Sequence, residues 1–270
     1  MVIDFHAHAF PDALAVRAIP KLAAAGNLHP YTDGTAQDLV RSMDEAGIDA
    51  TVVANIATNP RQMHNVNSWA IEANGGRLIQ FGSVHPENPE WEEELYRLRD
   101  AGVLGIKLHP DYQGFFVDQP QMFPIYRKVQ ELGFVLLFHS GYDVGLGEPI
   151  HCTPERLIHV MEEVDCSRFV LAHMGAYNQW DDVLRLVAGK NIYMDTAFCF
   201  GGRMPEELFD ALLRVHGTDK ILFGTDSPWA EQKAYVQDCR RLVPDPEVQE
   251  KILGGNAIRL LGLHSQEPTR

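Results

Sequence analysis

The chain has 270 residues, of which 45% are hydrophobic and 22% charged, and its formal net charge is −14 at pH 7. This composition allows a large buried core and argues against a disordered protein. Because such a chain repels phosphate backbones and anionic lipid surfaces, we expect no nucleic-acid partner and no membrane partner. The expected partner is a small-molecule substrate, about which the net charge says little.

The amino-terminal sequence MVIDFHAHAF contains the first apolar run, residues 2–5, and lacks the basic region and long apolar core of a signal peptide. The chain has no stretch of about 18 uninterrupted apolar residues, so we expect a cytoplasmic protein without a membrane span. The first connection is the longest and runs from His8 to about Ala50. Its helical stretch, 12–25, and the loop sequence GNLHPYTDG predict a flap over the mouth of the fold.

Seven further apolar, β-branched runs follow, of the kind expected for strands that are buried on both faces. They cover residues 50–54, 78–82, 104–108, 134–138, 169–172, 191–194 and 220–223. Segments with helical periodicity alternate with these runs, and several of them end at a glycine. They cover residues 37–46, 91–101, 122–132, 154–163 and 205–215. The last segment, 246–263, is predicted to be a closing helix.

Strands that alternate with helices predict parallel βα units. Two architectures compete, a closed eight-stranded barrel and an open doubly wound sheet. The number of strands and the chain length favour the barrel. An open sheet would show a glycine-rich phosphate turn after its first strand, where this chain reads HAHAF. We therefore predict an α/β fold, a single-domain (β/α)₈ TIM barrel over residues 1–270.

Polar side chains stand at the ends of several predicted strands, which is where barrel enzymes place their functional groups. His6 and His8 end the first strand, His139 follows the fifth, His173 the sixth and Asp226 the eighth. Since side chains alternate along a strand, those of His6 and His8 point to the same side and can bind one cation. Neutral imidazole and carboxylate are suitable ligands for Zn²⁺. The pattern predicts a metal-dependent active site.

The segments DFHAH, LLFHSG, LAHMG, LFGTDSPW and GNAIRLLG occur in this order along the whole chain. In this combination they resemble the amidohydrolase superfamily, and more narrowly its amidohydrolase-2 branch, which includes the aminocarboxymuconate-semialdehyde decarboxylase-like enzymes. The resemblance implies one divalent cation, Zn²⁺ first and Mn²⁺ as the alternative, bound by His6, His8, His139 and Asp226. It also implies that His173 polarises the substrate or water. A homodimer is an expectation at the level of this class.

A bound dication lowers the pKa of its water from about 15.7 towards roughly 7, which supplies hydroxide at neutral pH. We expect Asp226 to take a proton from that water through its second oxygen. His173 is expected to stabilise a developing oxyanion or to pass a proton. For His139 there is an alternative, in which it supports a ligand and does not bind the metal itself.

Further candidates flank this set. The sequence GIKLHP places Lys107 and His109 on one side of the fourth strand. Some relatives in the wider superfamily carry a carbamylated lysine after this strand that bridges two metals, so Lys107 is an alternative bridging ligand. His109 is expected to contact the substrate. Arg203 and Arg61, which follow strands, are candidates to hold a substrate carboxylate through two hydrogen bonds, and Trp229 to form a pocket wall.

Two reactions fit the same residues. Hydrolysis of an ester, lactone or amide bond of a small, carboxylated molecule is our first prediction, because the chain is short for the decarboxylase relatives. The alternative is a metal-dependent non-oxidative decarboxylase, a carboxy-lyase. A third reading is a non-catalytic metal-binding barrel, but such a protein would be expected to have lost one of the five strand-end residues.

Overall fold

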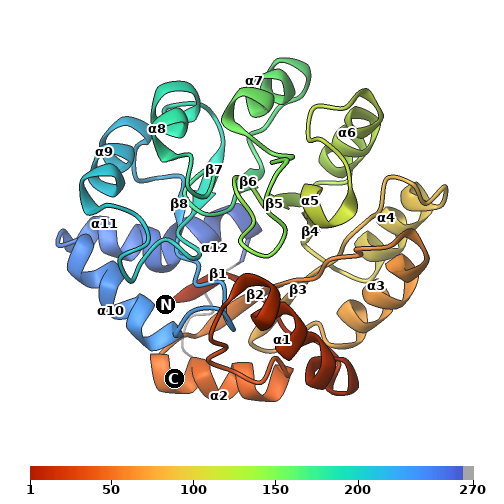
Figure 1. The fold of residues 1–270 in the computed structure, drawn as a ribbon, viewed down its shortest axis with the longest axis horizontal. Helices are drawn as coiled ribbons and strands as arrows, with labels where there is room; N and C mark the ends of the chain where they lie inside the picture. Colours follow the sequence, from red (N-terminus) through yellow and green to blue (C-terminus); the bar gives the residue numbers. More distant parts are fainter. Residues whose placement is uncertain (264–270) are drawn as a thin grey trace.

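The apolar runs of the sequence form the strands of a closed barrel in the computed structural model, which describes residues 1–263 (Figure 1). The strands are β1 (Ile3–Ala7), β2 (Ala50–Ala54), β3 (Leu78–Phe81), β4 (Gly105–Leu108), β5 (Val135–Phe138), β6 (Phe169–Leu171), β7 (Tyr193–Asp195) and β8 (Ile221–Leu222). Each predicted strand is present, and the TIM-barrel prediction is confirmed. The last part of the predicted domain, 264–270, lies outside the described residues.

Two seams close the barrel. The strands form one sheet of order β1-β2-β3 and a second of order β4-β5-β6-β7-β8, with parallel neighbours throughout. At the first seam the amide of Lys107 donates to the carbonyl of Gly82, 2.7 Å away. At the second, the amide of Asp226 donates to the carbonyl of His6 at 2.7 Å, and that of His8 to Ser227 at 2.6 Å. Closure of the barrel therefore brings the first and last predicted ligands together.

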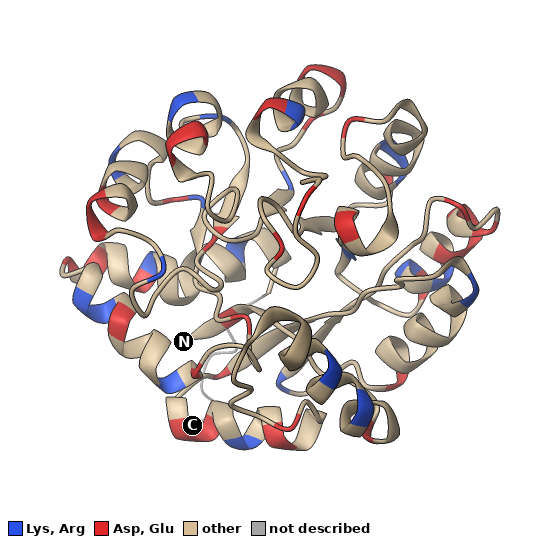
Figure 2. Cartoon of the chain, viewed as in Figure 1, with Lys and Arg blue, Asp and Glu red and all other residues tan. Residues whose placement is uncertain are grey.

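Helices surround the strands. The longer ones are α1 (Asp12–Gly26), α2 (Ala36–Ala46), α3 (Met63–Glu72), α4 (Trp91–Asp100), α6 (Phe123–Glu131), α7 (Pro154–Glu163), α9 (Glu206–His216) and α10 (Gln232–Leu242). Shorter pieces are η1 (Pro60–Gln62), α5 (Pro110–Gln113), η2 (Pro120–Met122), α8 (Trp180–Asp182) and the π-helical η3 (Val183–Val187). Acidic and basic residues are interspersed along these helices in Figure 2. Among residues 1–263, no helix has the length and apolar character needed to cross a bilayer.

The helix α2 shows why such segments fold as they do. The Thr35 side chain caps its first turn by accepting a hydrogen bond from the amide of Asp38 at 3.1 Å. Leu39 and Met43 lie four residues apart on one face and are buried. Arg41 pairs with carboxylates on the opposite, exposed face. One apolar face and one charged face fix the helix against the barrel.

Inward and outward side chains of the strands form two separate cores, as the alternation along a strand requires. Leu136 and Phe138 belong to the outer core, between strands and helices. The inner core contains Ile3, Phe5, Val52, Ala54, Phe81, Val135, Leu137, Val170, Ala172 and Leu222. Ala257 and Leu260, which lie in the last helical segment, pack against the inner core. That segment thus contributes to the filling of the barrel.

The predicted closing helix is present as three consecutive helical pieces, the middle one π-helical, without a break between them. They are α11 (Pro246–Glu250), the π-helical η4 (Lys251–Gly255) and α12 (Asn256–Leu261). Gly254 lies in the π-helical piece, where an added β-carbon would lie 2.2 Å from the carbonyl oxygen of Met1. Glycine permits this close approach of the two ends of the described chain.

The first connection contains α1 (Asp12–Gly26), on the near side of the barrel in Figure 1. The amide of Tyr31, in the loop after α1, donates to the carbonyl of Pro228 beyond β8 at 2.8 Å. At Gly26 an added β-carbon would lie 3.2 Å from the side chain of Val144, in the loop after β5. The connection therefore lies beside the carboxyl ends of the strands, and its action as a flap stays a prediction.

Gly105, at the start of β4, provides a test of packing inside the barrel. An added β-carbon would lie 2.4 Å from ring atoms of Phe81, which is fully buried and packs edge-on against Phe5. We expect Gly105→Ala to lower the free energy of unfolding by about 1–3 kcal/mol, as overpacking does. Guanidinium denaturation measures this. Gly255→Ala, whose β-carbon would lie 3.4 Å from the nearest atom, is the control, and equal midpoints for the two variants would contradict the prediction.

Candidate active site

A β-bulge directs the side chains of two histidines towards the barrel interior. The pairing of β1 with β2 shifts register between Asp4 and Ala7. Phe5 already points into the inner core, so strict alternation would turn His6 outwards. The extra residue of a bulge reverses the alternation. Both His6 and His8 consequently face the barrel axis at the end of β1, as the sequence predicted.

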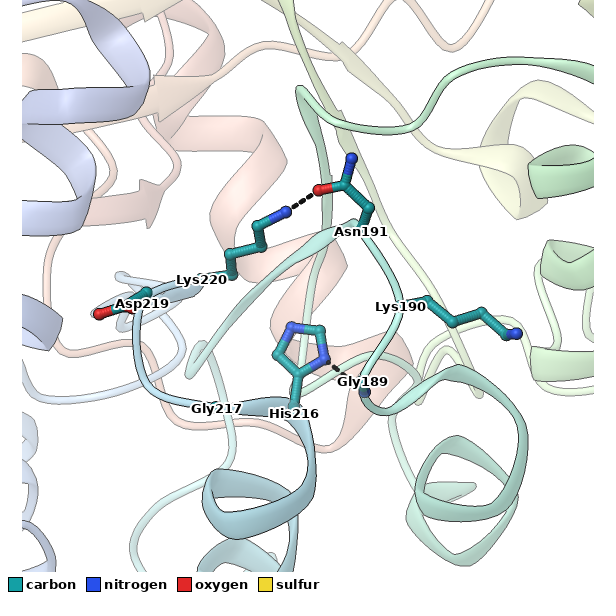
Figure 3. A pocket seen from close by; sticks show the side chains of 7 residues that line it. All are labelled: Gly189, Lys190, Asn191, His216, Gly217, Asp219 and Lys220. Carbon is teal, nitrogen blue, oxygen red and sulfur yellow. Dashed lines mark hydrogen bonds between the residues drawn. The ribbon is translucent and has the colours of Figure 1, made fainter.

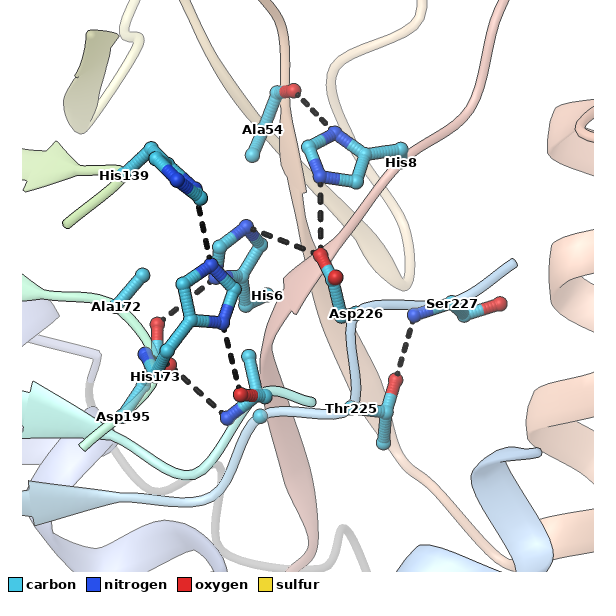
Figure 4. A network of polar contacts seen from close by, with 12 residues as sticks. His6, His8, Ala54, His139, Ala172, His173, Asp195, Thr225, Asp226 and Ser227 are labelled. Carbon is cyan, nitrogen blue, oxygen red and sulfur yellow. Dashed lines mark hydrogen bonds and ion pairs between the residues drawn. The ribbon is translucent and has the colours of Figure 1, made fainter. Parts of the chain in front are cut away.

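His6, His8 and Asp226 converge on one point (Figure 4). Nε2 of His6 lies 3.5 Å and Nε2 of His8 lies 3.2 Å from Oδ1 of Asp226. The other ring nitrogens are engaged by acceptors: Nδ1 of His6 donates to Asp195 at 2.9 Å and Nδ1 of His8 to the carbonyl of Ala54 at 3.0 Å. In the neutral rings both Nε2 atoms therefore present lone pairs to a carboxylate oxygen. Three acceptors that meet in this way fit a divalent cation.

His139 stands beside this group. Its Nδ1 lies 3.1 Å from Nε2 of His173, and its own Nε2 is buried without a hydrogen-bond partner among the described residues. Nδ1 of His173 donates to the carbonyl of Ala197 at 2.9 Å, so Nε2 of neutral His173 accepts the proton of His139 Nδ1. The lone pair of His139 Nε2 is then left free. A buried, unpartnered acceptor at this place suits the predicted fourth metal ligand.

Asp195 was missed by the sequence reasoning. Its Oδ1 accepts hydrogen bonds from the amides of His173 and Ala197, both at 3.0 Å, while its Oδ2 holds the His6 ring. Complete burial raises the pKa of Asp195 to about 7. The predicted seventh strand ended at Met194, one residue before the observed end of β7. Asp195 directly follows that predicted strand, as His139 follows the fifth, so the same strand-end rule would have included it.

Several residues at or after the same strand ends have a strained backbone. His173, Phe198 and Asp226 have φ values of 61°, 57° and 69°, a left-handed conformation that side chains other than glycine rarely adopt. Each such residue costs of order 1–3 kcal/mol and persists only where the surrounding structure fixes it. The hydrogen bonds of Asp195 to the His173 and Ala197 amides provide that fixation on the β6 side.

Lys107 lies inside the barrel beneath the histidines. It is 1% exposed, and its Nζ lies 3.2 Å from Nε2 of His6, to which the ammonium group donates. Burial lowers the pKa of Lys107 to about 8. Burial and the charge of Lys107 hold the pKa of His6 well below its usual range, so the imidazole is neutral. In this structure the ammonium group thus occupies the lone pair of His6 Nε2, which a cation bound at the site would take over.

The predicted substrate-binding residues lie in different surroundings. His109 is buried and stacks on His139, with ring centroids 4.0 Å apart. Arg203 is half-buried, and its guanidinium lies 4.0 Å above the ring of Phe198. Trp229 is half-buried three residues after Asp226, and its amide donates to that residue's carbonyl at 2.8 Å. Arg61 is exposed in η1.

Asp143, in the loop after β5, is a second residue that the sequence reasoning missed. Its Oδ2 lies 3.3 Å from Nε2 of His109 and 3.9 Å from Nε2 of His139. The three residues form a polar group of their own next to His6, His8 and Asp226. No periodic pattern points to Asp143, because it lies in an irregular loop.

Asp195→Asn is expected to change the tautomer of His6, because Asp195 now accepts the proton of His6 Nδ1. The two amides that now bind Oδ1 would take the amide oxygen of the asparagine, so its NH₂ group would face Nδ1 of His6. His6 would then carry its proton on Nε2 and lose the lone pair that faces Asp226. We expect metal affinity to fall about 10–100-fold, measured by zinc competition with a chelator. Asp118→Asn, at a half-buried ion pair with Arg156, is the control, and equal affinities of the two variants would refute the role given to Asp195.

A pocket of about 330 Å³ lies at the other end of the barrel, before β7 and β8 (Figure 3). Lys220 donates to the side chain of Asn191, and Nδ1 of His216 accepts from the amide of Gly189, while Nε2 of His216 is buried without a hydrogen-bond partner among the described residues. Because the pocket lies before these strands, it is separate from the site at their carboxyl ends.

Comparison with known proteins agrees with this geometry. A family model described as amidohydrolase matches residues 3–263. The 2-amino-3-carboxymuconate-6-semialdehyde decarboxylase of Dictyostelium discoideum is 23% identical over 227 residues, which cover 72% of this chain and 63% of the relative. The chain thus spans less than two thirds of the length of that curated relative.

Solved structures share the fold. A dihydroxybenzoic acid decarboxylase from Polaromonas, with bound manganese and the inhibitor 2-nitroresorcinol, is 18% identical, with a TM-score of 0.68 and 97% of both chains covered. A probable 2-pyrone-4,6-dicarboxylic acid hydrolase from Acinetobacter baumannii, with citric acid bound, is 19% identical, with a TM-score of 0.66 and 97% of this chain and 99% of that chain covered. Further decarboxylases are among the similar structures.

The family model reaches from the first residue of β1 to the end of the described chain. The strand-end residues that carry the sequence resemblance lie within this range and converge at one end of the barrel. The chain therefore belongs to the amidohydrolase family, in its amidohydrolase-2 branch, a branch of metal-dependent enzymes.

Proposed function

We propose that this protein is a metal-dependent carboxy-lyase, which removes CO₂ from a small carboxylic acid without oxidation. The observation that carries the proposal is the sequence relationship to a decarboxylase in a chain that keeps the convergent His6, His8 and Asp226 group. The chain length no longer favours hydrolysis over decarboxylation, because a decarboxylase structure is matched over 97% of both chains. Decarboxylation thus replaces hydrolysis as the first choice.

His6, His8, Asp226 and His139 would hold one divalent cation, with Zn²⁺ and Mn²⁺ as the candidates. The first three offer acceptors that face one another, and His139 offers a buried lone pair. His139 would be a ligand through Nε2, since its Nδ1 is engaged with His173. When bound, the cation would neutralise substrate oxygens and stabilise the negative charge that develops in the reaction.

In this reaction the bond between the substrate carbon and its carboxylate carbon breaks, and CO₂ leaves. The electron pair stays on the substrate carbon and takes up one proton. His173 is the proposed donor, through Nε2, because its Nδ1 is committed to Ala197. Burial lowers the pKa of His173, so the ring is neutral at rest and takes one proton from solvent for each turnover.

Arg203 is the proposed partner for an anionic end of the substrate. Its guanidinium covers Phe198, whose ring centroid is 5.5 Å from that of Tyr177, and the Tyr177 ring is 6.1 Å from that of His173. This row of neighbouring rings leads from the Arg203 guanidinium to His173. A guanidinium binds a carboxylate with two parallel hydrogen bonds.

Product analysis tests the proposal. Metal-loaded protein is incubated in D₂O with ¹³C-carboxylate-labelled hydroxybenzoates and unsaturated dicarboxylates, and in parallel with lactones. We expect one labelled CO₂ per product and one deuterium at the carbon that lost it. A product that has gained the elements of water, with the carboxylate retained, would instead establish a hydrolase.

Hydrolysis remains the second candidate because of a specific feature of His173. In the neutral ring, Nε2 is an acceptor, which suits removal of a proton from water better than donation to carbon. The fold relative named as a dicarboxylic acid hydrolase agrees with this possibility. Both candidates act on a carboxylated molecule at the same residues.

A further inference from the structure

The Asp143 carboxylate is held in one orientation. Its Oδ1 accepts hydrogen bonds from the amides of Gly145 at 2.8 Å and Leu146 at 2.9 Å. The side chain is 12% exposed. Among the described residues no hydrogen bond reaches Oδ2, which faces the polar groups after β4 and β5. One oxygen is thus anchored by the loop, and the other is presented to the site.

The neighbours of Oδ2 offer it one N–H donor, on His109, and one further acceptor, on His139. Nδ1 of His109 accepts from the amide of Tyr112 at 3.3 Å, so neutral His109 carries its proton on Nε2, which is 3.3 Å from Oδ2. On the other side, Nε2 of His139 presents a lone pair at 3.9 Å. A carboxylate oxygen and a ring nitrogen therefore stand side by side, both as acceptors. If a cation takes up the His139 lone pair, Oδ2 remains as an anionic acceptor at the edge of the cation site.

We propose that Asp143 determines specificity by accepting, through Oδ2, a hydrogen bond from a hydroxyl or amino group of the substrate. This inference rests on the proposed function, since it places that donor near the carboxylate that the metal centre holds. The favoured ligand class is a small carboxylic acid with a hydrogen-bond donor, and the same acid with its donor blocked binds more weakly.

Asp143→Asn is the informative variant, because the anchoring amides decide its orientation. They require an oxygen, so the asparagine oxygen replaces Oδ1 and its NH₂ group replaces Oδ2. The substitution turns an acceptor into a donor with little change of shape. Asp143→Ala removes the group altogether and is the second variant. Asp118→Asn, at a half-buried ion pair with Arg156, is the matched control.

The probes are 2- and 3-hydroxybenzoate, their methyl ethers, and benzoate. Their affinities for zinc-loaded protein are measured by titration calorimetry, with the metal-free protein as reference. For at least one isomer we expect wild type and Asp118→Asn to prefer the hydroxyl compound about tenfold or more over its ether, as a hydrogen bond to a charged group allows. In Asp143→Asn and Asp143→Ala this ratio is expected to fall to about one or below.

The outcomes separate the inference from the proposed function. If benzoate binds only with metal, but wild type shows no hydroxyl preference or the Asp143 variants keep it, the inference is wrong and the proposed function stands. If none of the probes binds with metal, both are overturned. A preference that Asp118→Asn also loses would show a general effect of removing an acidic group and would likewise refute the role of Asp143.

Discussion

Replacement of His8 by alanine is expected to remove most of the bound metal and, with it, turnover. His8 is the preferred ligand to test, because its other ring contact is a single hydrogen bond to the Ala54 carbonyl, whereas His6 also binds Asp195. A four-ligand zinc site contributes about 10–16 kcal/mol, so one ligand accounts for about 3 kcal/mol, or more than a hundredfold in affinity. Metal content by plasma mass spectrometry and affinity by chelator competition measure the effect.

His64→Ala is the control for the loss of a histidine, since His64 is exposed on α3. We expect about one equivalent of metal in wild type and in this control, and less than about a tenth in His8→Ala. Unchanged metal content in His8→Ala would refute the proposed centre. About two equivalents in wild type would favour the alternative in which carbamylated Lys107, in contact with His6, bridges two metals.

The barrel and the convergence of its strand-end residues follow from patterns that the sequence displays directly. Apolar runs define strands, and closure places the end of β8 beside β1, so that Asp226 meets His6 and His8. Along the chain, these residues are located by the ends of the predicted strands. That is why one rule, the location of function at the carboxyl ends of barrel strands, was enough to find them.

The residues that orient the strand-end histidines, and the backbone conformations that they stabilise, depend on features that periodicity does not display. The bulge that turns His6 inwards and the left-handed backbone of His173 are local departures from regular strand geometry. Asp195 was missed although it directly follows the predicted seventh strand, and Asp143 lies in a loop without periodicity. The amides that hold Asp143 belong to Gly145 and Leu146 in the same irregular loop, whose course no strand or helix periodicity predicts.

His173→Asn is expected to retain the metal and to lose turnover by about 10²–10⁴-fold, the contribution of a positioned acid or base. Asparagine tolerates the left-handed conformation that His173 adopts, with φ of 61°. Its NH₂ group can also donate to the Ala197 carbonyl in place of Nδ1. The variant therefore removes Nε2, the ring nitrogen that is not committed to the Ala197 carbonyl, with little disturbance of the backbone. The measurements are kcat with the metal-loaded protein and metal content on the same sample.

The matched control is His85→Asn, at a buried histidine after β3, whose Nδ1 accepts from the amide of Glu87 at 3.2 Å, a contact that an asparagine oxygen can replace. Retention of more than about a tenth of wild-type turnover in His173→Asn would contradict a role in proton transfer, because that contribution is at least about a hundredfold. Loss of metal in His173→Asn, together with its retention in His139→Asn, would exchange the roles of these two residues. Since Nε2 of His173 and Nδ1 of His139 are 3.1 Å apart, only such a paired measurement can assign ligand and proton carrier between them.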